Sequence, residues 1–83
     1  MKDDTFNKVV NAIAEMMSVP ANSLTADMTL DEIGMDSLEG LQLLIELEQV
    51  TGIQVEEADM KRFTTIQSIV DLLNERFHKS AAA

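Results

Sequence analysis

The sequence predicts an all-α protein: a small four-helix bundle with three longer helices, one short helix and a long loop between helices 1 and 2. In three segments, apolar residues recur at the spacing of one helix face. No segment alternates apolar and polar residues long enough to indicate a strand. The 83 residues suffice for one small domain with a modest core. We expect this domain over residues 1–78, followed by a disordered tail or cloning remnant at 79–83.

The first helix is predicted over residues 4–17, with Asp3 or Asp4 as its cap. Its apolar residues at helical spacing are Phe6, Val9, Val10, Ile13, Met16 and Met17. Residues 18–35 mix turn-forming residues with four isolated apolar ones, Leu24, Met28, Leu30 and Ile33. This mixture predicts a loop that is attached to the core at intervals. A connection of this length in a small domain is usually functional.

The second helix is predicted from Ser37 to about Val50, with Gly52 in the left-handed conformation that commonly ends helices. Asp36 is a favoured N-cap residue, and Glu39 three positions later completes a variant of the capping box. Ser37 is then the first helical residue, with an exposed hydroxyl. A phosphate ester on that oxygen would lie beside unpaired backbone N–H groups and the positive end of the helix dipole, which favour an anion.

Successive helical residues lie about 100° apart, which gives the second helix two apolar faces. The face expected to join the core carries Gly40, Leu43, Leu44, Leu47 and Val50. The opposite face carries Leu38, Leu41 and Ile45, bordered by Glu39, Glu46 and Glu48. A helix buried on both sides is one interpretation. Unpaired carboxylates are rarely buried, however, so we favour a surface on which partner proteins dock.

The last third of the chain predicts two helices. Residues 56–62 form a short one, and residues 64–67 form a capping box that opens the last helix. The apolar residues of the last helix are Ile66, Ile69, Val70, Leu73 and Phe77. The acidic residues outside the second helix are expected to be solvated surface: Asp3, Asp4, Glu56, Glu57 and Asp59. Methionines at positions 16, 17, 28, 35 and 60 are soft, adaptable side chains that we expect in the core.

Two motifs carry a family resemblance. Residues 30–38 read Leu-Asp-Glu-Ile-Gly-Met-Asp-Ser-Leu, and residues 63–67 read Phe-Thr-Thr-Ile-Gln. With the helix between them, residues 4–78 resemble an acyl carrier protein. The resemblance implies that a phosphopantetheinyl transferase attaches 4′-phosphopantetheine from coenzyme A to Ser37, with Asp36 supporting the magnesium site of the transferase. The thiol of the arm would then carry an acyl group as a thioester, and the five methionines could separate to admit its acyl chain between the helices.

The resemblance also implies that acyl-transferring and synthase enzymes with basic patches dock on the second helix. Their contacts would be Leu38, Glu39, Leu41, Ile45, Glu46 and Glu48. Some residues depart from the family pattern: Thr51 replaces a common aromatic residue, Glu56 a common proline, and Gly40 interrupts the usual start of the helix. These departures favour a polyketide or other secondary pathway over fatty-acid synthesis. An aminoacyl or peptidyl carrier, which Asp36 disfavours, and an unmodified acidic interaction module stay open.

Composition excludes several other functions. The net charge of −9 argues against binding to nucleic acid or anionic membranes, and the lack of cysteine excludes disulfides and thiolate sites. No apolar stretch approaches the ~20 residues of a membrane span. The only histidine, His78, lies far along the chain from Ser37, so we expect no catalysis. The acidic residues around Ser37 lack the spacing of a calcium loop, so we expect no metal site. We also expect a monomer and a cytoplasmic location.

Overall fold

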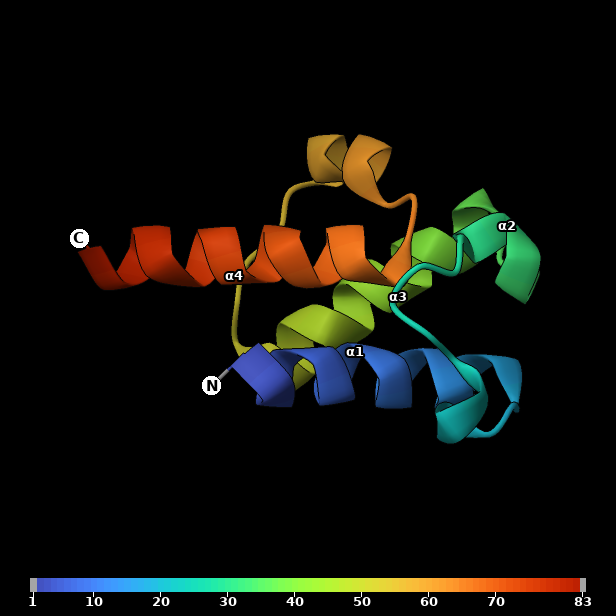
Figure 1. Ribbon diagram of the computed structural model, residues 1–83. Helices are drawn as coiled ribbons and strands as arrows, with labels where there is room; N and C mark the ends of the chain where they lie inside the picture. The colour runs from blue at the N-terminus through green and yellow to red at the C-terminus, as the bar shows by residue number, and fades with distance from the viewer. Residues whose placement is uncertain (1, 83) are drawn as a thin grey trace.

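The computed structural model describes the backbone of residues 2–82 and the side chains of residues 4–77. Three long helices dominate: α1 (Lys2–Met17), α3 (Ser37–Thr51) and α4 (Ile66–Ala82). Between them lie one short α-helix and two 3₁₀ helices: η1 (Ala21–Ser23), α2 (Leu30–Ile33) and η2 (Glu57–Arg62). In Figure 1, α3 lies between α1 and α4, and η2, drawn above α4 in this view, contacts both α3 and α4. The predicted all-α fold is confirmed.

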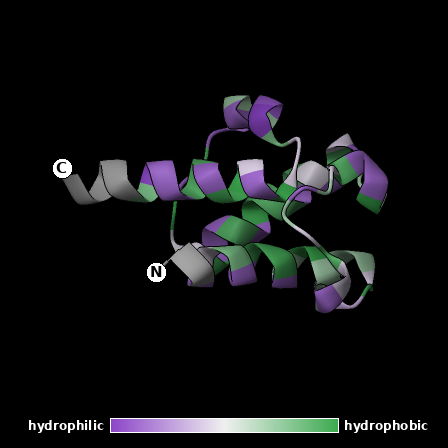
Figure 2. Ribbon diagram, in the orientation of Figure 1, coloured by the Kyte–Doolittle hydropathy of each residue, from purple (hydrophilic) through white to green (hydrophobic). Residues whose placement is uncertain are grey.

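The core is formed by the facing sides of the three long helices. Eight side chains are less than 2% exposed: Val9, Ile13, Leu43, Leu47, Ile66, Ile69, Leu72 and Leu73. In Figure 2, green hydrophobic and purple hydrophilic stretches alternate along α1 and α4, as expected of helices with one buried face. Two expected core residues are in fact exposed, Val50 by 42% and Phe77 by 55%. Both lie toward the ends of their helices, where neighbouring helices cover the apolar face less completely.

Helix α1 begins at Lys2, two residues before the predicted start. Asp3 and Asp4 therefore lie within its first turn, so neither is its N-cap, and the side chain of Asp3 lies outside the described residues. The helix ends at Met17, as predicted. Ser18 then takes the left-handed conformation with φ of 56°, and the Val19 N–H donates to the Ala14 carbonyl at 3.0 Å. This is the hydrogen bond of a Schellman-type helix end.

The connection between α1 and α3 is more ordered than the predicted loop, because it contains η1 and α2. Its apolar residues are attached to the core as expected: Leu24 and Leu30 are buried, and Met28 and Ile33 are partly buried. The connection also bonds to the start of α4. Leu30 N–H donates to the Thr64 carbonyl, Ile66 N–H to Met28, and Gln67 N–H to Ala26, at 3.0, 3.1 and 2.9 Å.

These bonds shift the cap of α4 by one residue from the predicted position. The reciprocal pair is Thr65 and Ser68: the Ser68 N–H donates to Thr65 Oγ1 at 3.1 Å, and the Thr65 N–H donates to Ser68 Oγ at 3.0 Å. The predicted box of Thr64 with Gln67 is wrong, because the Gln67 side chain donates to Asp71 at 2.8 Å. The backbone of residues 79–82, which we expected to form a tail, continues α4. A domain boundary at residue 78 stays a prediction.

The predicted short helix is present as η2, but the expectation that Asp59 is solvated is wrong. Asp59 is only 8% exposed. Its Oδ1 accepts a hydrogen bond from Arg76 Nη2 of α4 at 2.7 Å, and its Oδ2 accepts from the Glu56 N–H at 3.1 Å. Charge pairing and hydrogen bonding offset the cost of burying the carboxylate. A second ion pair, between Arg62 and Glu75 at 2.9 Å, also joins η2 to α4.

The Arg62–Glu75 pair should make a small, pH-dependent contribution to stability. Hydrogen bonds from Arg62 hold the pKa of Glu75 below its ordinary value of 4.5. A depressed folded-state pKa stabilises the fold above the unfolded-state value, and this stabilisation is lost as the pH falls through the folded-state pKa. Glu75→Gln should therefore lower the urea midpoint slightly at neutral pH and not in acid. Glu15→Gln, on α1, is the control; a deficit that persists in acid would contradict this assignment.

Candidate functional site

The start of α3 is held in place by hydrogen bonds between side chains and backbone. Asp36 precedes the helix in an extended conformation, with φ of −96° and ψ of −175°. Its Oδ1 accepts from the Glu39 N–H at 2.9 Å, and the Asp36 N–H donates to Glu39 Oε1 at 3.2 Å. The predicted capping box is confirmed, and Ser37 is the first helical residue.

The segment before Asp36 holds the start of α3 from the other side. Gly34 ends α2 in the left-handed conformation with φ of 94°, where a residue with a side chain would be strained. The Met35 N–H donates to the Leu30 carbonyl at 2.9 Å, and the Met35 side chain is 4% exposed. Met35 is thus anchored in the core two residues before Ser37, and the N-cap Asp36 directly precedes Ser37.

Ser37 itself is exposed, and its hydroxyl has no hydrogen-bond partner among the described residues. The ionisable side chains beside it in sequence are the carboxylates of Asp36 and Glu39. The side chain of His78 lies outside the described residues. The site therefore presents an exposed hydroxyl oxygen at a helix N-terminus, where another molecule can reach it.

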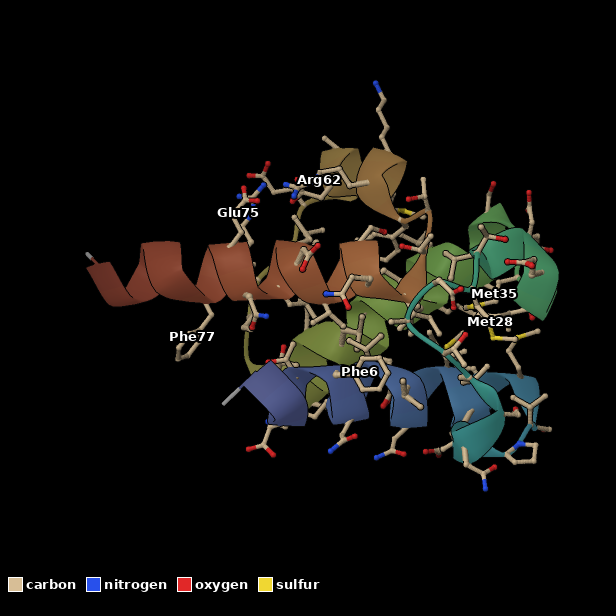
Figure 3. All side chains as sticks on the ribbon, viewed as in Figure 1. Phe6, Met28, Met35, Arg62, Glu75 and Phe77 are labelled. Atoms are coloured by element: carbon tan, nitrogen blue, oxygen red, sulfur yellow. The ribbon has the colours of Figure 1, made fainter. Side chains whose placement is uncertain are left out.

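A groove of about 410 Å³ opens directly beside Ser37. It lies between α2, the first turn of α3 and η2, and its lining residues are Leu30, Asp31, Met35, Asp36, Ser37, Gly40, Met60 and Phe63. The volume falls in the range of small-molecule sites, about 300–1,000 Å³. Figure 3 shows Met35 at the α2 end of the molecule. The sequence analysis did not identify this groove, although Leu30 and Phe63 each begin one of the two motifs.

Gly40 has a specific steric role in the groove. It is buried, and a β-carbon at this position would lie 3.3 Å from the Met60 methyl carbon. The missing side chain therefore lets η2 pack closely on α3. The sequence predicted that Gly40 belongs to the buried face. It did not show which residue approaches it, because Met60 lies twenty positions later in the chain.

The outer face of α3 remains at the surface. Leu38 is 65% exposed and Ile45 is 50% exposed, whereas Leu41 is half-buried. The bordering carboxylates of Glu39, Glu46 and Glu48 are partly exposed. The helix is therefore not buried on both sides. The structure brings the proposed docking residues to one face that adjoins Ser37, and their docking role stays a prediction.

Removing the cap should weaken the fold measurably. Asp36→Ala leaves the Glu39 N–H without its partner, and we expect a loss of about 1 kcal/mol in the free energy of unfolding, as for other N-cap deletions. Asp36→Asn keeps an acceptor oxygen at the same place and should retain most of the stability. Urea unfolding followed by circular dichroism measures both. Equal losses in the two variants would show that charge, and not capping geometry, stabilises this helix start.

Two other kinds of site are absent from the residues that the structure describes. No helix among them has the combination of length and apolar content needed to cross a membrane. No cluster of three or more histidine, cysteine, aspartate or glutamate side chains with metal-binding geometry was found among them.

Comparison with known proteins identifies the family. Residues 7–73 match the family described as "Phosphopantetheine attachment site". The chain is 35% identical over 83 residues to acyl carrier protein 4, chloroplastic, of Arabidopsis thaliana, covering 99% of this chain but only 61% of that protein. It is 31% identical over 78 residues to the acyl carrier protein of Petrotoga mobilis, covering 93% and 92%. For the acyl carrier protein of Onion yellows phytoplasma, identity is 36% over 66 residues, covering 78% and 87%. The chain belongs to the acyl carrier protein family.

Proposed function

We propose that Ser37 is the attachment site of the 4′-phosphopantetheine group and that the attached arm carries acyl groups between biosynthetic enzymes. Membership of the family supports an acyl carrier function and a covalently attached prosthetic group. The observation that carries the assignment to Ser37 is its exposed hydroxyl at the first position of α3, behind the Asp36 cap. A phosphodiester there lies beside backbone N–H groups and the positive end of the helix dipole.

The loading reaction requires a second enzyme. A phosphopantetheinyl transferase joins the pantetheine phosphate of coenzyme A to Ser37 Oγ. One phosphorus–oxygen bond forms to Ser37, the pyrophosphate phosphorus–oxygen bond of coenzyme A breaks, and adenosine 3′,5′-bisphosphate leaves. The hydroxyl proton leaves to a base on the transferase. The Asp36 carboxylate is exposed beside Ser37 and can face the transferase magnesium ion while it caps α3. When bound, the prosthetic group supplies a terminal thiol that holds the cargo as a thioester.

The groove beside Ser37 suits a chain that extends from this residue. Leu30, Met35 and Phe63 supply apolar lining, while Asp31 and Asp36 add acidic groups. Of the five methionines proposed to admit an acyl chain, Met35 and Met60 line the groove. Thioether side chains adapt to irregular apolar surfaces, so they can accommodate cargo of varied shape.

The outer face of α3 is the proposed docking surface, formed by Leu38, Glu39, Leu41, Ile45, Glu46 and Glu48. Its exposed apolar side chains can be buried by a partner, and its carboxylates can steer an enzyme with a basic patch. We expect Ile45→Ala and Glu46→Gln each to raise the KM of a transferase for the carrier without loss of helical content. Glu57→Gln, on η2, is the matched control. Unchanged KM values for both α3 variants would show that this face is not the docking surface for the transferase.

The proposal for the cargo rests on residues that differ from the common pattern of the family. Thr51, Glu56 and Gly40 favour a polyketide or other secondary pathway over fatty-acid synthesis. The alternative cargo is an aminoacyl or peptidyl group. The alternative function is an unmodified acidic interaction module. A monomeric state and a cytoplasmic location stay predictions.

The decisive experiment is loading by a broad-specificity transferase with coenzyme A and Mg²⁺, followed by intact-mass and peptide analysis. We expect a gain of one phosphopantetheine on the peptide that contains Ser37. An established carrier protein, treated in parallel, verifies the transferase. No gain on folded protein with an active control would favour the unmodified interaction module.

A further inference from the structure

We propose that the ion pair between Asp59 and Arg76 sets the width of the groove beside Ser37, by holding η2 so that Met60 lies against Gly40. The effect of the ion pair on the position of η2 concerns the unmodified protein. The consequence for an acyl chain rests on the proposed attachment at Ser37.

Two ion pairs among the described side chains join η2 to α4. Asp59 and Arg76 meet at 2.7 Å, with their side chains only 10% and 26% exposed. Arg62 and Glu75, labelled in Figure 3, form the second contact, but these side chains are 44% and 57% exposed. Solvent screens the exposed pair strongly and the buried pair much less. The Asp59–Arg76 pair should therefore dominate the attachment of η2 to α4.

Asp59 also organises η2 internally. While Oδ1 accepts from Arg76, Oδ2 accepts from the Glu56 N–H at the start of η2. Among the described residues, Asp59 is the one carboxylate bonded to the Arg76 guanidinium, whose Nε is buried without a hydrogen-bond partner. The Asp59 carboxylate thus bonds to the backbone at the start of η2 and also to α4.

The next residue, Met60, makes the contact with α3. Successive residues of a 3₁₀ helix point about 120° apart, so Asp59 can face α4 while Met60 faces α3. Met60 is partly buried beside Gly40, and the other four residues of η2, Glu57, Ala58, Lys61 and Arg62, are exposed. Within η2, the inward-facing contacts are therefore Asp59 and Met60. Because Asp59 and Met60 are adjacent in this short helix, we expect a displacement of Asp59 from Arg76 to shift Met60.

Met60 forms part of the groove, together with Phe63 directly after η2. The Phe63 N–H donates to the Met60 carbonyl at 3.0 Å, which links the two lining residues. Because Gly40 has no side chain, Met60 can slide over the α3 backbone without a steric barrier at that position. Weakening the ion pair is therefore expected to open the groove on the η2 side.

The first test uses the unmodified protein with ¹³C-methyl-labelled methionine. The double variant Asp59→Asn with Arg76→Gln removes both charges, so neither is left buried alone. We expect a changed and broadened Met60 methyl resonance, with the Met16 resonance on α1 unchanged. Arg62→Gln, which breaks only the exposed pair, is the matched control and should leave Met60 in place. An unchanged Met60 resonance in the folded double variant, or an equal change in Arg62→Gln, would overturn the proposal.

The second test measures protection of a bound chain. Octanoyl-phosphopantetheine is loaded from octanoyl coenzyme A, and hydroxylamine then cleaves the thioester to an octanoyl hydroxamate and a free thiol. We expect several-fold faster cleavage in the double variant than in the wild type or Arg62→Gln. Equal rates in the loaded proteins would refute the effect of groove width on cargo. Failure of the wild type to load would instead refute attachment at Ser37 and leave the methyl result unaffected.

Discussion

Ser37→Ala is expected to abolish phosphopantetheine incorporation completely while the helical fold remains. The substitution removes the oxygen on which the phosphodiester would form. It should cost little stability, because the hydroxyl is exposed and has no hydrogen-bond partner among the described residues. Intact-mass analysis after transferase treatment measures loading, and circular dichroism measures the fold.

Ser23→Ala is a suitable control for this experiment. Ser23 is an exposed serine on η1, and its hydroxyl donates to the Pro20 carbonyl at 2.6 Å, away from the proposed attachment site. This variant should load like the wild type. Incorporation into Ser37→Ala would place the attachment elsewhere, and a loss of helical signal would show that Ser37 is required for folding.

Leu47→Ala is expected to have the largest effect on stability. Leu47 is fully buried on the core-facing side of α3. Replacing a buried leucine with alanine typically costs about 2–5 kcal/mol, from lost burial and the cavity left behind. A single small core rarely supplies more than about 3–5 kcal/mol of net stability. A large unfolded fraction is therefore expected without denaturant, measured by circular dichroism and urea titration.

Ile45→Ala separates stability from docking on the same helix. Ile45 is 50% exposed, so its truncation should change the free energy of unfolding by only about 0.5 kcal/mol. It should nevertheless weaken partner binding if the outer face of α3 is a docking surface. Equal losses of stability in Leu47→Ala and Ile45→Ala would contradict the assignment of inner and outer faces.

Local patterns predicted the start of α3 with accuracy. Asp36 and Glu39 are three residues apart, so the hydrogen bonds that define their capping box are decided within one helical turn. The bounds of α3 and its Gly52 end were predicted for the same reason. The exposed position of Ser37 followed directly from this local geometry.

Features that depend on distant segments were predicted less well. The cap of α4 lies at Thr65 because backbone carbonyls from the loop bond to its first N–H groups. Asp59 is buried because Arg76, seventeen residues later, reaches it. Phe77 has the spacing of a core residue, yet it is exposed toward the end of α4. The bonding partners of the α4 cap and of Asp59, and the exposure of Phe77, all depend on how whole helices are arranged.

The sequence by itself therefore determined the helical class, the core-facing stripes and the serine at the capped start of α3. Helical periodicity and capping involve residues within one or two turns, so both patterns can be recognised in the local sequence. Only the tertiary structure decided that a groove adjoins Ser37 and that Met60 lies against Gly40. These contacts join segments far apart in the chain, so they exist only once α2, α3, η2 and α4 have packed together.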